Sequence, residues 1–159
     1  MRTLAAISVL LLFAGCQTAP PEGLTDADRA AINKVSADYV AAARAADWDA
    51  WTELWTTDAV YQVPDAPALV GHAEIRASVD GFTDPPTEMN ATIDAMDGSG
   101  KWAWARGNFV FAVPETEDMP EMRMVGSFLW VLEKQPDGTW LIDTECYNSD
   151  TPPEMPPEG

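Results

Sequence analysis

The sequence predicts an α+β domain in which three N-terminal helices pack on a mainly antiparallel sheet. Apolar residues recur at helical spacing in the first half of the chain, whereas aromatic and β-branched runs fill the second half. Two of these runs flank the turn Pro136-Asp137-Gly138, which predicts a β-hairpin. Helices followed by consecutive strands are typical of an α+β domain.

The first helix is predicted over 26–46, where Thr25 and Asp28 can form a capping box at its start. Asp47 can cap a second, short helix, and a third helix is predicted from Gly71 to about residue 82. The second helix is expected to carry an apolar stripe made of Trp48, Trp51, Leu54 and Trp55.

The predicted strands are short near the helices and longer towards the C-terminus. Pro64 should end the first one, because proline cannot donate to a ladder. Gly107 stands between Trp102 and Trp104, which share one parity, and a group of opposite parity: Phe109, Phe111 and Val113. This pattern predicts at Gly107 either a bulge that exchanges the two faces or a bend in the sheet. The predicted strands are 59–64, 90–96, 101–114, 121–134 and 140–150.

Residues 1–15 resemble a bacterial lipoprotein signal peptide. Arg2 precedes an apolar run over 4–14, which is too short for a transmembrane helix. The run ends in Leu-Phe-Ala-Gly-Cys, which resembles the lipobox and implies that an acylated Cys16 anchors the protein in a lipid bilayer. An ordinary signal peptide cleaved after another small residue is the alternative.

The remaining segments follow from this assignment. Gln17 after the cysteine implies, by analogy with enteric lipoproteins, the outer membrane and a periplasmic location. Residues 16–23 are predicted to form a tether, residues 24–150 a single domain, and residues 151–159, which hold four prolines, a disordered tail.

Composition argues against several classes of function. The formal net charge is −17 and no basic stripe is present, so nucleic-acid binding is disfavoured. His72 is the single histidine, and we find no zinc-ligand spacing, phosphate-binding loop or nucleophile elbow. We therefore expect no metal and no cofactor.

The last predicted strand carries the strongest candidates for a site. Strict alternation places Leu141, Asp143, Glu145 and Tyr147 on one face. The other face would hold Trp140, Ile142, Thr144 and Cys146, which predicts that Cys146 is a buried, inert thiol.

Several local patterns resemble the SnoaL-like branch of the nuclear-transport-factor-2-like superfamily. They are Ala-Asp-Trp-Asp-Ala-Trp at 46–51, Thr-Asp-Ala-Val-Tyr at 57–61, Val-Gly-His-Ala-Glu-Ile-Arg at 70–76, Asp-Gly-Thr-Trp at 137–140 and Tyr-Asn-Ser-Asp at 147–150. The resemblance implies a curved sheet that wraps around the helices as a cone with an apolar cavity. It also implies a possible homodimer formed through the sheet.

Ketosteroid isomerase, an enzyme of this superfamily, uses an aspartate base with a tyrosine and a protonated aspartate as oxyanion donors. By resemblance, its tyrosine corresponds to Tyr39, but its base falls on Val63 and its second aspartate on or near Ser127. That acid–base set is incomplete, so steroid isomerisation by this mechanism is not expected. The predicted ligand-binding residues are Tyr39, Trp55, Tyr61, Val63, His72, Ser127, Glu145 and Tyr147.

Three functions stay open at this point. The first hypothesis is a membrane-anchored domain whose cavity binds a small hydrophobic molecule without catalysis. The second is a cavity isomerase, dehydratase or hydrolase, in which Glu145 is the general base and Tyr39 or Tyr61 is a donor. A simpler role for Glu145 is a hydrogen bond to backbone or to Arg106. The third hypothesis is a structural envelope dimer whose cavity is filled by its own side chains.

Overall fold

The computed structural model describes residues 23–115 and 121–150. The predicted signal peptide, the predicted lipid-attachment residue Cys16, the predicted tether up to residue 22 and the predicted tail 151–159 lie outside the described residues. Within the described part of the chain, no helix is both long enough and apolar enough to cross a bilayer.

In the described part of the chain, the first two helices begin beside the capping residues that the sequence predicts, whereas the third has no side-chain cap. Helix α1 (Asp26–Arg44) begins with the expected capping box, in which Thr25 Oγ1 accepts from the Asp28 amide and Asp28 Oδ2 accepts from the Thr25 amide. Helix α2 (Trp48–Thr52) is capped by Asp47, which accepts from the amide of Ala50 at 3.0 Å. Helix α3 spans Gly71–Ala77.

Within residues 23–115 and 121–150, six strands form one sheet in the order β2-β1-β6-β5-β4-β3. Among these described strands, β1 and β6 are parallel and all other neighbours are antiparallel. The strands are β1 (Trp55–Gln62), β2 (Leu69–Val70), β3 (Glu88–Ser99), β4 (Trp102–Val113), β5 (Met122–Lys134) and β6 (Trp140–Ser149). The expected order of elements is therefore confirmed, apart from the two-residue β2, which is too short to give a sequence signal.

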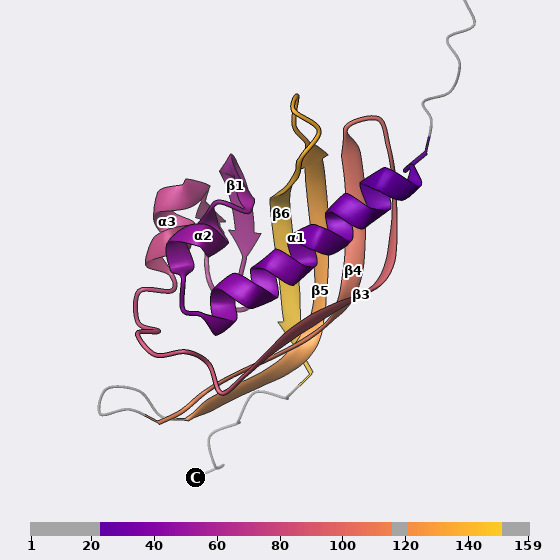
Figure 1. Ribbon diagram of the computed structural model, residues 1–159. Coiled ribbons are helices and arrows are strands. Elements are labelled where there is room, and N and C mark those ends of the chain that lie inside the picture. The colour runs from indigo at the N-terminus through magenta and orange to yellow at the C-terminus, as the bar shows by residue number, and fades with distance from the viewer. Residues whose placement is uncertain (1–22, 116–120, 151–159) are drawn as a thin grey trace, which may run out of the picture.

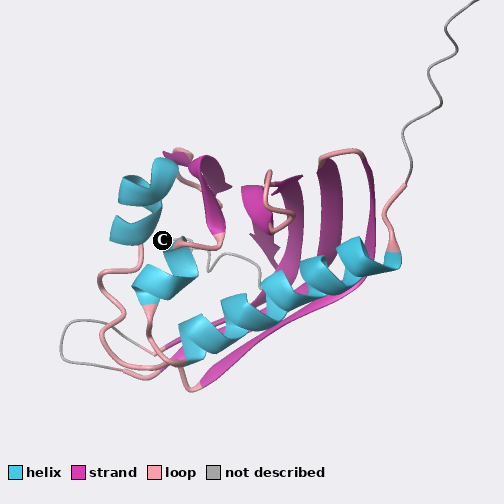
Figure 2. Ribbon diagram, turned by 45° about the horizontal axis from the view of Figure 1, so that its top comes forward, coloured by secondary structure: helices cyan, strands magenta, loops and turns pink. Residues whose placement is uncertain are grey.

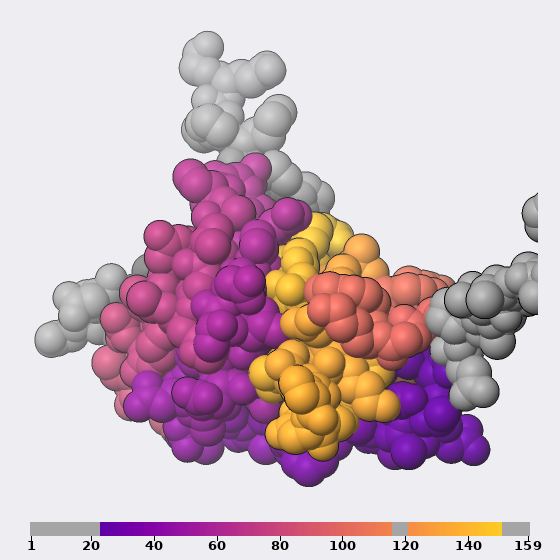
Figure 3. All heavy atoms as spheres, turned by 90° about the horizontal axis from the view of Figure 1, so that it is seen from above, coloured from indigo at the N-terminus to yellow at the C-terminus, as the bar shows by residue number. Residues whose placement is uncertain are grey.

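Helix α1 lies across one face of the sheet, and the long strands β3, β4 and β5 bend towards it (Figure 1). Figure 2 shows α2 and α3 closing one end of the space between α1 and the sheet. At the other end, the β3–β4 and β5–β6 turns lie side by side near the start of α1 (Figure 3), where Lys101 pairs with Glu133. The predicted α+β fold with a curved sheet is therefore confirmed.

Asp28 connects α1 to the far end of the sheet. Its Oδ1 accepts from Lys134 Nζ at 2.6 Å and from the Trp140 indole at 3.2 Å, while its Oδ2 accepts from the Thr25 hydroxyl. These contacts, led by the one with Lys134, hold the pKa of Asp28 well below its usual range. The carboxylate thus joins the helix cap to β5 and β6.

The alternation of β4 differs from the prediction at Gly107. Trp102 and Trp104 are exposed on the outer face, and the opposite parity stays inward without interruption past Gly107 to Phe109 and Phe111. The register shift lies instead in the neighbouring β3, between Ile93 and Ala95. Residue 107 must be glycine because β3 and β4 approach closely at this point: a Cβ there would lie 1.8 Å from the Thr92 carbonyl oxygen.

Candidate functional site

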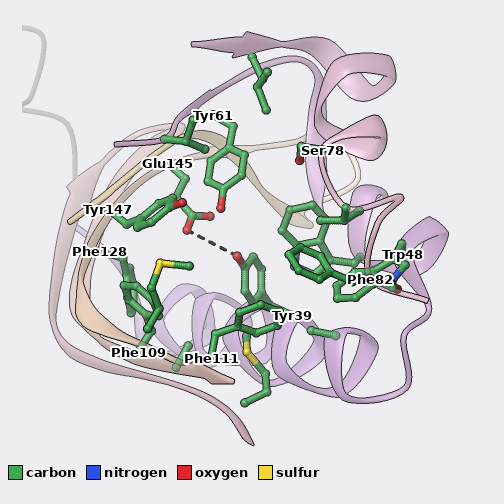
Figure 4. A pocket seen from close by; sticks show the side chains of 18 of the residues that line it. Tyr39, Trp48, Tyr61, Ser78, Phe82, Phe109, Phe111, Phe128, Glu145 and Tyr147 are labelled. Carbon is green, nitrogen blue, oxygen red and sulfur yellow. Dashed lines mark hydrogen bonds between the residues drawn. The ribbon is translucent and has the colours of Figure 1, made fainter. Parts of the chain in front are cut away.

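A cavity of about 410 Å³ lies between the helices and the inner face of the sheet. This volume is in the range of small-molecule sites. The lining is dominated by aromatic side chains from both layers (Figure 4). These are Tyr39, Trp48, Trp51, Tyr61, Phe82, Phe109, Phe111, Phe128, Trp130 and Tyr147.

Glu145 projects from β6 into this aromatic lining and is only 4% exposed. The Tyr39 hydroxyl donates to Glu145 Oε1 over 3.5 Å, the contact drawn in Figure 4. Glu145 Oε2 has no hydrogen-bond partner among the described residues. No Lys, Arg or His side chain lines the described cavity, so this buried carboxyl group has no counter-charge there.

Burial sets the protonation state of the site. It raises the pKa of Glu145 to about 8, and the nearby Trp130 indole and Tyr39 hydroxyl offset only part of the rise. Burial and the neighbouring carboxyl group also raise the pKa of Tyr39, and burial is the main cause of the raised pKa values of Tyr61 and Tyr147. At pH 7 the site therefore holds a mostly neutral carboxylic acid among neutral phenols.

The aromatic rings around Glu145 pack against one another and form a continuous wall. Tyr39 contacts Trp51 and Trp130, each with ring centroids 5.2 Å apart. On the side of the last strand, Tyr147 contacts Tyr61 at 5.7 Å and Phe109 at 5.5 Å. Tilted and edge-to-face packing of this kind holds the side chains in place and keeps the cavity shape defined.

A bulge in β6 explains how Glu145 and the buried Trp140 come to face the same side. Val131 pairs with Thr144 and Leu132 with Ile142, so Asp143 is an extra residue without a partner in β5. The bulge exchanges the two faces midway along the strand. Strict alternation therefore gave the wrong environment for Cys146, which is exposed rather than buried.

The structure brings five of the predicted ligand-binding residues to the cavity and keeps three away from it. Those at the cavity are Tyr39, Tyr61, Val63, Glu145 and Tyr147. Trp55 is 1% exposed within the core beside the cavity, and His72 Nε2 lies 2.9 Å from the Trp55 carbonyl oxygen. Ser127 lies in a groove on the outer face of the sheet, because its neighbour Phe128 takes the inward position.

The outer groove also holds Arg106, which is therefore not the partner of Glu145. Val63 lines the cavity with an aliphatic side chain. Near Ser127, where the resemblance places the second aspartate of ketosteroid isomerase, the side chain that lines the cavity is Phe128. The acid of this cavity thus comes from β6, and the aspartate pair of ketosteroid isomerase has no counterpart among the described residues.

Sequence reasoning missed the lining residues contributed by the middle of the sheet and by the loop after α3. Phe109 and Phe111 share one parity of β4, which signals an inner face but does not tell core from cavity. Met122 and Met124 add flexible side chains to the lining. Among the described residues, no group of three or more potential ligands could hold a metal ion.

The fold and the cavity define a class of protein. The sequence profile of the SnoaL-like domain family matches residues 37–138, and the chain belongs to this family. No curated protein is detectably similar to the chain in sequence.

Solved structures with the same architecture support this assignment. A ketosteroid isomerase-like protein from Erwinia carotovora atroseptica superposes with a TM-score of 0.70 at 22% identity, over 80% of this chain and 100% of that one. A nuclear-transport-factor-2-like protein with a cystatin-like fold from Novosphingobium aromaticivorans gives 0.62 at 25% identity, over 78% and 82%. A protein from Mycobacterium tuberculosis gives 0.68 at 19% identity, over 85% and 84%. The nuclear-transport-factor-2-like fold is therefore confirmed.

Proposed function

We propose that this protein binds a small hydrophobic molecule in the cavity between α1 and the sheet. The observation that carries the proposal is a preformed space of about 410 Å³ with aromatic walls and one buried carboxyl group. Apolar pockets with few polar groups are typical of small-molecule sites. A space of this size counts against the hypothesis that the protein's own side chains fill the cone.

Filling the cavity should abolish ligand retention. Ala91 lines the cavity from β3, and Ala91→Phe adds a ring there. We expect native mass spectrometry of the Cys16→Ser chain, purified from a bacterial periplasm, to show a small-molecule adduct. Adding Ala91→Phe to this chain should remove the adduct. Thr92→Phe places the same ring on the exposed face of that strand and should keep the adduct. An unliganded mass that stays unchanged in a hydrophobic metabolite mixture would overturn the proposal.

The position of Glu145 also favours a second candidate, a cavity enzyme acting by isomerisation, dehydration or hydrolysis. A buried carboxyl group with a pKa of about 8 can exchange a proton with a bound molecule near neutral pH. Tyr39, which already donates to Glu145, or Tyr61 could donate to a developing oxyanion. In this case Glu145→Gln abolishes turnover, while affinity for an uncharged ligand changes little.

We further propose that the domain is held at the bacterial cell envelope by lipid on Cys16. The support is the lipobox-like sequence, which implies acylation of that residue. When the full chain is made in a bacterium, we expect Cys16→Ser to abolish incorporation of labelled palmitate and release the protein from the membrane fraction. Cys146→Ser should keep both label and location. Labelling of the Cys16→Ser protein would contradict this assignment.

A further inference from the structure

We propose that the molecule bound in the cavity is a small hydrophobic amine whose ammonium group pairs with Glu145. This inference rests on the cavity binding proposed above and specifies the chemistry of the ligand. It starts from an unusual juxtaposition: a carboxyl group without a counter-charge stands inside a wall of aromatic rings.

The hydrogen-bonding capacity left unused at Glu145 matches an ammonium group. Glu145 is 4% exposed, it points into the cavity, and its Oε2 lacks a partner among the described residues. An ammonium group carries three donors and no acceptor, so one of its N–H groups can satisfy Oε2. The hydroxyl oxygens of Tyr39 and Tyr61 lie on the same side of the cavity and can accept from the others.

The cavity walls suit a cation better than an anion. Tyr39, Trp51 and Tyr61 form one aromatic chain with ring centroids 5.2 to 6.2 Å apart. Tyr147 packs on Tyr61 and on Phe109, so the chain continues beside the carboxyl group. The faces of such rings attract cations, most strongly in a desolvated site. A net charge of −17 also steers cations towards the protein and anions away from it.

Binding of the amine should release one proton from Glu145. The carboxyl group is mostly neutral at pH 7, and an ammonium group beside it favours the ionised form, so the proton leaves to the buffer. Tyr39 from α1, Tyr61 from β1 and Tyr147 from β6 face the carboxyl group but have raised pKa values and stay neutral. Trp130 from β5 is uncharged. Glu145 is therefore the group that titrates.

Three probes with one skeleton test the inference: 2-phenylethylamine, 2-phenylethanol and 3-phenylpropanoate. We expect calorimetric titration of the Cys16→Ser chain at pH 7 to show the amine binding about tenfold more tightly than the alcohol, with the carboxylate weakest. Titration in two buffers with different ionisation enthalpies should show proton release when the amine binds, and none when the alcohol or the carboxylate binds. Glu145→Gln, which keeps the side-chain shape, should remove both the preference and the proton release. Glu53→Gln changes an exposed glutamate and should remove neither.

The outcomes separate the two proposals. If the alcohol binds as tightly as the amine or more tightly, or if Glu145→Gln keeps the preference for the amine, the ligand class is wrong while cavity binding stands. If none of the three probes binds and no adduct is retained from the metabolite mixture, both proposals fail. Amine binding that Ala91→Phe does not weaken would place the amine outside the cavity and overturn the inference.

Discussion

Replacing Glu145 by glutamine is expected to stabilise the protein, and the gain should grow as the pH rises. The folded protein holds this carboxyl group at a pKa of about 8, whereas its ordinary value is 4.5. The folded state therefore binds a proton that the unfolded chain releases between these two values, so the free energy of unfolding falls as the pH rises through this range. The full loss for the wild-type protein is about 5 kcal/mol.

Urea unfolding at pH 5, 7 and 9 measures this effect. At pH 5 the wild-type protein and Glu145→Gln should differ by less than about 1 kcal/mol, and at pH 9 the variant should be more stable by about 5 kcal/mol. Glu53→Gln, on an exposed glutamate, should follow the wild-type curve at each pH. A parallel pH dependence in wild type and Glu145→Gln would show that Glu145 ionises normally in the folded protein.

Adding a methyl group at Gly126 is expected to destabilise the protein by more than about 3 kcal/mol. Gly126 is buried in β5 next to β6, and a Cβ there would lie 1.8 Å from the Asn148 carbonyl oxygen. That oxygen belongs to the backbone of the neighbouring strand, so the collision is relieved only if β5 and β6 move apart. Because Tyr147 lies next to Asn148, the cavity wall should loosen as well.

Urea unfolding and near-ultraviolet circular dichroism of Gly126→Ala report the two consequences, lost stability and loosened aromatic packing. Gly81→Ala is the matched control, because the exposed Gly81 has nothing within 4 Å of an added Cβ. It should change the free energy of unfolding by less than about 0.5 kcal/mol. Equal stability of Gly126→Ala and Gly81→Ala would mean that β5 and β6 leave room for a Cβ at residue 126.

The site could be predicted only in part, because two of its features depend on neighbouring strands. Tyr39 and Tyr61 were found through the family resemblance and do line the cavity. Ser127 was predicted to bind the ligand, but the side chain that points into the cavity is that of its neighbour Phe128. Cys146 was given the wrong environment, since the unpaired Asp143 becomes visible only when β6 is aligned with β5.

The sequence by itself determined the order of the main elements, the starts of the first two helices and the family. Capping residues, turn residues and hydrophobic periodicity act over a few neighbours along the chain, so Thr25, Asp28 and Asp47 could be assigned their roles without coordinates. Only the tertiary structure decided where the bulges fall and that Gly107 and Gly126 allow close approach of adjacent strands. It also decided that Glu145 stands among aromatic rings with no Lys, Arg or His in the described cavity lining. These features depend on contacts between residues far apart in sequence, and the carboxyl group owes its raised pKa to burial by the assembled layers.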